Sequence, residues 1–268
     1  MEVVYLYDGS FEGFLSCVFD SYVYQESPAH FWDPARQELT LLPARQIPTV
    51  PGHADRVRVC LGRIAPDALD LVVKGFLTCA PEREVLLFRF IQKLLIRGKP
   101  LLRQLTDETV LPLQKAVRHL EGEVHLLKGF VRFSEFEGTL AGEIRPKNRV
   151  LPLLRYHFCD RMYNEVFLLY DRTNREALVH RPGRWAILPL EEFHMAAPSE
   201  EEAMYRRLWK QFYDAIEIKE RHNPKLRRTH MPQRYWETMT EFQGEDYFRP
   251  GAAPSDHAPS LPGGGLVP

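Results

Sequence analysis

The sequence predicts an α+β protein in which helices and strands occupy separate stretches of the chain. Three observations lead to this fold class: an apolar strand at the start, helical periodicity over about 53–128, and alternating patterns over about 129–190. Segregated elements favour a helical N-terminal half packed on a mainly antiparallel sheet. Because 44% of the 268 residues are hydrophobic, the chain can bury a sizeable core, and we expect a single domain over 1–242.

The chain opens with a pattern that predicts a strand, a turn and a helix. "EVVYLY" is typical of a strand that could join the main sheet, and Asp8 and Gly9 end it. Ser10 suits an N-cap before apolar residues at helical spacing. "DGSFEGFL" lacks the lysine and the spacing of a phosphate-binding P-loop. Two interpretations stay open: a simple turn, or an anion site in which Asp8 and Ser10 meet a DNA phosphate.

The remaining elements follow in order. Residues 26–52 indicate a loop with one or two short extended pieces, and four helices are expected over 53–64, 65–79, 82–98 and 106–129. The last of these helices would start at Thr106 or Asp107 and kink at Pro112. A hairpin with a turn at Glu137-Gly138, a short helix in "VLPLLRYHFCDRM" and strands in "EVFLLYD", "EALVH" and "RWAILP" come next.

A C-terminal helix and a basic arm are expected over 199–242. Ser199 is the predicted N-cap of the helix, with Glu202 at the capping-box position. The Pro-, Gly-, Ala- and Ser-rich stretch at 243–268 predicts a disordered tail.

Composition restricts the possible functions. The net charge of -1 suggests no general affinity for polyanions, so any electrostatic recognition requires a local patch. The four cysteines have no metal-site spacing, and the histidines form no metal motif, so we expect neither a metal nor another cofactor. No apolar run is long enough to span a bilayer and no signal peptide is visible, which predicts a cytoplasmic protein.

The most informative feature is a basic segment near the C-terminus. Residues 206–236 contain nine basic and three acidic residues, a local charge of +6. Arginines contact phosphates, and aromatic rings can stack on unpaired bases. The alternative is a solvated helix face with its aromatic residues in the core. The candidate nucleic-acid contacts in the arm are Arg221, Lys225, Arg227, Arg228, Arg234, Tyr235 and Trp236.

A second group of candidates lies at 145–161. Arg145, Lys147 and Arg149 follow a predicted strand and, with Arg155 and Arg161, could extend the basic surface. In "RYHFCDR", His157 and Asp160 are weak candidates for acid–base catalysis. A structural polar cluster or a phosphate contact explains the same residues.

Several separated motifs resemble one known family. "YLYDGSFEGFLSCVF", "VRFSEFEGTLAGEIRPKNRVLPLLRYHFCDR", "FLLYDRTNREALVHRPGRWAI" and "RRTHMPQRYWETMTEF" together look like a bacterial family of DNA metabolism or DNA repair proteins built on a domain of unknown function. The likeness covers nearly all of residues 2–242. It implies a neighbouring radical-SAM protein of DNA modification or repair, and some members are fused to a uracil-DNA glycosylase. It supplies neither a reaction nor catalytic residues.

The resemblance and the basic arm together predict an accessory protein that binds DNA beside a radical-SAM partner. We find no glycosylase domain and no C-x-x-x-C-x-x-C cluster in the chain, so iron–sulfur chemistry would belong to that partner. Two alternatives remain: an enzyme that acts on DNA through His157 and Asp160, and a pure protein-interaction scaffold.

Overall fold

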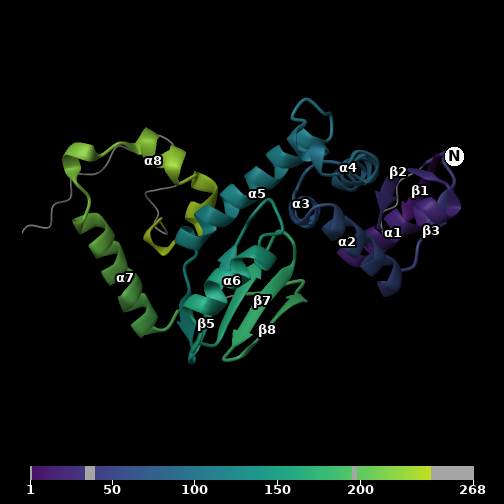
Figure 1. Ribbon diagram of the computed structural model, residues 1–268. Coiled ribbons are helices and arrows are strands. Elements are labelled where there is room, and N and C mark those ends of the chain that lie inside the picture. Colours follow the sequence, from purple (N-terminus) through teal and green to yellow (C-terminus); the bar gives the residue numbers. More distant parts are fainter. Residues whose placement is uncertain (1, 34–39, 195–197, 243–268) are drawn as a thin grey trace, which may run out of the picture.

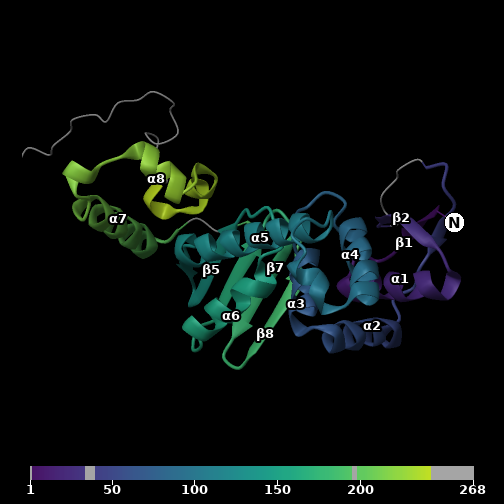
Figure 2. The same cartoon turned by 45° about the horizontal axis from the view of Figure 1, so that its top comes forward.

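Two separate β-sheets organise the molecule, one at its N-terminal end and one near its middle (Figures 1 and 2). The computed structural model describes residues 2–33, 40–194 and 198–242. The α+β class is confirmed, whereas the expected tail at 243–268 lies outside the described residues. No helix in the described part is long and apolar enough to cross a membrane.

The first sheet is small and entirely parallel. It consists of β1 (Glu2–Leu6), β2 (Ser27–Trp32) and β3 (Ala44–Gln46) in the order β2-β1-β3, and α1 (Phe11–Tyr24) connects β1 to β2. The idea that the first strand joins the main sheet is therefore wrong. Val3, Val4 and Tyr5 are all buried, so β1 needs cover on both faces, which is typical of a parallel strand next to its crossover helix.

A group of helices packs around this sheet and forms the first apolar core. They are α2 (Pro51–Ile64), α3 (Pro66–Phe76), α4 (Arg83–Arg97), the short 3-10 helix η1 (Lys99–Arg103) and the start of α5 (Val110–Phe130). Pro51 and Pro66 occupy first helical positions, where a missing N–H has no consequence, and Gly98 ends α4.

The helix α5 begins later than the sequence predicted. Asp107 accepts hydrogen bonds from the backbone N–H and the hydroxyl of Thr109, so the chain turns there, before the first helical residue Val110. Pro112 consequently lies in the first turn of the helix, where its missing N–H removes no helical hydrogen bond.

The second sheet is mixed rather than simply antiparallel. Its order is β4-β5-β6-β7-β8, with antiparallel pairs except for the parallel pair β5–β6. The strands are β4 (Ser134–Phe136), β5 (Thr139–Ile144), β6 (Phe167–Asp171), β7 (Glu176–Arg181) and β8 (Arg184–Pro189). The predicted short helix forms α6 (Leu151–Arg161) and provides the crossover that a parallel pair requires. The hairpin with its Glu137-Gly138 turn is confirmed, and both turn residues have positive φ.

One helix belongs to both apolar cores. Val110, Leu113 and Val117 of α5 pack in the first core. Leu120, Val124 and Leu127, further along the same helix, pack in the second core between α6 and the five-stranded sheet. Most of the predicted helical half thus packs around the small sheet, and α5 extends from it to the large one (Figure 1). The segment after α3 adds further contacts, since the carbonyl of Leu77 accepts from the N–H of Arg149 and the N–H of Cys79 donates to Asn148, each at 2.9 Å.

The C-terminal elements lie at the far end from β1 (Figures 1 and 2). They are α7 (Glu200–Ala215), η2 (Lys219–Arg221), α8 (Pro224–His230), η3 (Gln233–Thr238) and η4 (Thr240–Phe242). Ser199 caps α7 as predicted, because its side chain accepts a hydrogen bond from the N–H of Glu202. Tyr235, Trp236, Met239 and Phe242 return the chain to the second core.

The turn between β1 and α1 explains the opening motif. Ser10 accepts from the N–H of Gly13 at 2.9 Å, and the Asp8 carboxylate accepts from the Ser10 hydroxyl and the Thr49 hydroxyl, each at 2.7 Å. Burial opposes ionisation, but these hydrogen bonds outweigh it and hold the pKa of Asp8 below its usual value. A Cβ on Gly13 would lie 2.2 Å from an Asp8 oxygen, so this position requires glycine.

We therefore expect Gly13→Ala to lower the free energy of unfolding by about 2 kcal/mol, because the added methyl group displaces the Asp8 carboxylate. Gly122→Ala in α5 is the matched control, since a Cβ there meets nothing within 4 Å and alanine favours a helix. Urea denaturation of both variants checks this prediction. Equal stability of the two variants would contradict it.

Candidate nucleic-acid interface

The Glu123 carboxylate joins two of the predicted basic segments. It lies on α5, its side chain is 1% exposed, and it accepts from the backbone N–H groups of Lys147 and Asn148 at 2.9–3.1 Å. The Asn148 amide donates to it at 2.7 Å and Arg234 at 2.9 Å. The loop after β5 and the helix η3 are thus held against α5 by one buried anion.

Tyr235 completes the Glu123 cluster. Burial raises the pKa of Tyr235 to about 12, so its phenol stays protonated and donates to Glu123 at 3.2 Å. Arg234 donates to the same phenol oxygen. Sequence reasoning did not identify Glu123, because one acid on a helix gives no sign that two distant loops will supply its donors.

The two aromatic residues proposed for base stacking belong to the second core. Tyr235 is 2% exposed and Trp236 5%. The Trp236 ring stacks on Phe242 with centroids 4.6 Å apart, and its indole N–H donates to the carbonyl of Met231 at 2.9 Å. Neither ring is available to a base in this structure.

Three of the predicted arginines are bound to carboxylates. Arg145 lies 2.5 Å from Glu237, and Arg234 contacts Glu123. Arg149 lies 2.8 Å from Glu176. Such an arginine adds less positive charge to the surface than its number in the sequence suggests, because its carboxylate partner compensates it.

A cavity of about 210 Å³ at the carboxyl ends of β5 and β6 is also lined by arginines that pair with carboxylates. Four of its lining residues are arginines, and each has a carboxylate partner at 2.5–3.4 Å: the pairs are Arg132–Glu241, Arg145–Glu237, Arg172–Glu143 and Arg206–Glu202. The cavity is therefore polar but has no uncompensated positive charge.

Three of the predicted contacts in and just before α8 are cations without a carboxylate partner. Arg221, Lys225 and Arg228 are exposed, and no carboxylate of the described residues lies within ion-pair distance of them. Lys147 and Arg161 are exposed and unpaired in the same sense, although they lie elsewhere. Arg227 is partly buried over the rings of Trp236 and Phe242, and its Nε atom is buried without a hydrogen-bond partner.

A cavity of about 270 Å³ adjoins these cations. Arg221, His222, Asn223, Arg227 and His230 are among the residues that line it. Its one acidic lining residue is Glu217, whose carboxylate lies 2.5 Å from Nδ1 of His222. Asn223 caps α8 by accepting from the N–H of Leu226 at 3.0 Å.

His157 and Asp160 do not form an acid–base pair in the described part of the molecule, since no hydrogen bond joins them. Burial, together with the charges of Lys128 and Arg161, lowers the pKa of His157, so its neutral form is favoured. The ring of His157 packs edge-on against Phe158. This environment favours a neutral, partly buried ring.

A second buried carboxylate lies at the turn between β6 and β7. Asp171 is fully buried and accepts from the N–H groups of Thr173 and Asn174 at 3.0 Å, which fixes the turn. Burial, with a contribution from nearby Glu176, raises the pKa of Asp171 to about 6. One oxygen of Glu176 is itself buried without a hydrogen-bond partner.

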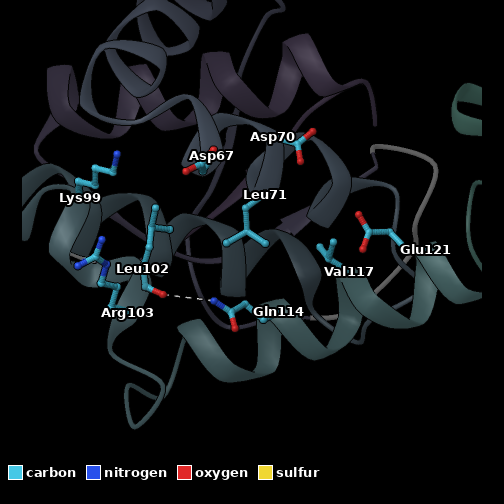
Figure 3. A pocket seen from close by; sticks show the side chains of 9 residues that line it. All are labelled: Asp67, Asp70, Leu71, Lys99, Leu102, Arg103, Gln114, Val117 and Glu121. Carbon is cyan, nitrogen blue, oxygen red and sulfur yellow. Dashed lines mark hydrogen bonds between the residues drawn. The ribbon is translucent and has the colours of Figure 1, made fainter.

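Another cavity, of about 440 Å³, lies between α3, η1 and α5 (Figure 3). Its charges are separated: Lys99 and Arg103 lie at one side and Asp70 and Glu121 at the other (Figure 3). Lys74 pairs with both of these acids, at 2.7 and 2.9 Å. No group of three or more metal-ligating side chains occurs among the described residues.

A family model for a domain of unknown function, DUF4130, matches residues 81–241. The chain belongs to this family. The DUF4130 match begins just before α4 and ends in η4, so it contains the Glu123 cluster and all of the buried second core except Phe242, whereas β1 to α3 precede it. No curated protein matches the chain.

We expect Glu123→Ala to lower the free energy of unfolding by about 3–5 kcal/mol, because it leaves the guanidinium of Arg234 and the amide of Asn148 without their buried partner. Glu121→Ala on the same helix removes a half-exposed ion pair with Lys74 and should cost less than about 1 kcal/mol. Denaturant unfolding compares the two variants. Similar losses of unfolding free energy in the two variants would show that the buried contacts of Glu123 do not stabilise the fold more than an exposed ion pair does.

Asp171 is expected to make stability depend on pH. Its pKa is about 6 when folded and about 4 when unfolded, so the folded state binds the proton more tightly. The stabilisation is complete below pH 4 and is lost as the pH rises through 6, by about 3 kcal/mol in total. The stability advantage of the wild type over Asp171→Asn should therefore shrink between pH 4 and pH 7, measured by urea unfolding. A pH-independent difference would exclude this role.

Proposed function

We propose that this protein is a nucleic-acid-binding accessory protein of DNA metabolism or repair, and that α8 contacts the phosphate backbone. The single observation that carries the proposal is the group of unpaired cations Arg221, Lys225 and Arg228 on one short stretch of surface. The likeness of the separated sequence motifs to DNA metabolism and repair proteins supports the same conclusion.

The absence of carboxylate partners at these three residues matters for affinity. A cation that meets a phosphate displaces counterions from the nucleic acid, and this release drives binding. An arginine that already pairs with an acid must first exchange that partner, so it contributes less. On this basis Arg145, Arg149 and Arg234 hold the fold together, whereas the α8 cations bind the ligand.

The cavity beside α8 supplies additional donors. The buried Nε of Arg227 has no hydrogen-bond partner, and a phosphate oxygen that enters the cavity would satisfy it. His222 and His230 line the same cavity, and Glu217 already pairs with His222. The arrangement suits a sequence-independent contact, because none of these groups needs to reach a base edge.

A protein partner is the second part of the proposal, and one observation favours it. No residue of α7 is buried, and its apolar side chains form an exposed stripe: Met204, Tyr205, Leu208, Trp209, Phe212 and Ile216. Contiguous exposed apolar surface marks sites of protein association. The radical-SAM protein that the sequence resemblance implies is the partner we propose for this stripe. A scaffold without nucleic-acid affinity is the alternative function.

Replacing Arg221, Lys225 and Arg228 together by alanine should weaken binding to every DNA sequence alike. We expect the slope of log affinity against log salt concentration to fall by about 3, one unit for each lost phosphate contact. Fluorescence anisotropy with a labelled duplex over a salt series measures both quantities.

A triple variant of Arg63, Lys115 and Arg118, all exposed and without carboxylate partners among the described residues, removes the same charge elsewhere and should change affinity less. Unchanged affinity and slope in the α8 variant would overturn the α8 assignment. Stable co-purification with the radical-SAM protein, combined with no DNA binding by the wild type, would favour the scaffold function.

A further inference from the structure

One cation on α6 bridges two exposed aromatic rings. The guanidinium carbon of Arg155 lies 3.9 Å from the ring centroid of Tyr156 and 3.9 Å from that of Trp185. Tyr156 is 67% exposed and Trp185 49%. Large aromatic side chains usually lie in cores, so a pair held together at the surface calls for an explanation.

The fold keeps both rings at the surface. Leu151, Leu154 and Phe158 form the buried face of α6, so Tyr156 lies on the opposite side of the helix. Trp185 lies on β8, the edge strand, directly opposite His180 of β7. His180 is buried and stacks on Phe167 with ring centroids 4.8 Å apart. This packing fixes the strand position that pairs with Trp185.

Two further cations lie at the tip of the β7–β8 hairpin. Arg184 precedes Trp185 and pairs in register with Arg181, and because successive strand residues point to opposite faces, both arginines start from the face opposite Trp185. Both side chains are exposed, and no carboxylate of the described residues lies within ion-pair distance of either. The acid on α6 is Asp160, which is exposed and follows Tyr156 by one helical turn.

We propose that Tyr156, Arg155 and Trp185 form a base-stacking platform for single-stranded nucleic acid. The inference deepens the nucleic-acid-binding function proposed above and rests on it. Unpaired bases stack on exposed aromatic faces, and cationic side chains beside them take the phosphates. In this arrangement Arg155 fixes the two rings, which lowers the entropy cost of binding, and supplies the positive charge beside them.

The platform gives the protein a preference between nucleic-acid structures. Bases inside a duplex are stacked on one another and cannot cover a protein ring without leaving the helix. The α8 cations need only phosphates and accept either form. The structure therefore assigns duplex-tolerant binding to α8 and single-strand selectivity to α6 and β8, which lie in different parts of the molecule (Figures 1 and 2).

The test compares a short oligothymidine with a blunt duplex in anisotropy titrations of the full chain. We expect the double variant Tyr156→Ala/Trp185→Ala to lose single-strand affinity by about tenfold for each ring and to keep its duplex affinity. Tyr22→Ala/Tyr163→Ala removes two exposed aromatic rings from other sites and should leave single-strand binding unchanged.

A conservative variant separates stacking from folding. Tyr156→Phe/Trp185→Phe keeps two aromatic faces and should keep the single-strand preference, so a loss there as well as in the alanine variant would overturn the platform. In the wild type, oligothymidine should quench tryptophan fluorescence, and this quenching should shrink in the Trp185→Phe variant. Unchanged quenching would also overturn it.

The platform and the α8 assignment can fail separately. If the α8 triple variant loses duplex binding while Tyr156→Ala/Trp185→Ala binds both probes like the wild type, the platform is wrong and the proposed function stands. If instead the α8 variant binds both probes normally and the platform variant loses the oligothymidine, the platform stands and the α8 assignment falls. A wild-type chain that binds neither probe overturns both.

Discussion

The buried Glu123 carboxylate is the interaction on which the second half of the molecule depends. It is enclosed by donors from the loop after β5 and from η3, two segments separated by more than eighty residues of sequence. A carboxylate removed from water is tolerated only when its lone pairs are used, and here backbone amides, an asparagine, an arginine and a tyrosine use them. The path of the C-terminal chain over α5 follows from that requirement.

This arrangement divides the positive charges of the chain into two groups. Arginines near the sheet, such as Arg132, Arg149 and Arg234, neutralise buried acids. Removing one of them would leave a buried carboxylate without its cationic partner. The exposed cations on α8 and at the β7–β8 hairpin do not neutralise a buried acid. A local charge of +6 in the sequence therefore overstates what the surface offers to a polyanion.

Local signals in the sequence predicted local structure well. The Glu137-Gly138 turn and the Ser199 cap both act within a few residues, so their effect is visible in the sequence. Partners distant in sequence were not visible. The parallel pairing of β5 with β6 and of β1 with β2 depends on where the crossover helices pack, and no local motif encodes that.

The same limit applied to the candidate interface. Tyr235 and Trp236 have neighbours of the kind that nucleic-acid-binding aromatics have, but the apolar face of η3 and η4 buries them. Tyr156 and Trp185 lie nearly thirty residues apart, and only the packing of α6 beside the edge strand brings them to one cation. The sequence predicted Arg155 as a nucleic-acid contact, but it did not indicate that Arg155 would lie against the rings of Tyr156 and Trp185.

The continuous helix α5 has a thermodynamic consequence for the whole chain. Its first half packs in one apolar core and its second half in the other. Unfolding of either core would therefore expose one end of α5 while the other end stays packed. Helix formation is cooperative, and a frayed end weakens the turns beside it. The two halves therefore share one helix, and the stability of each core contributes to the stability of the other.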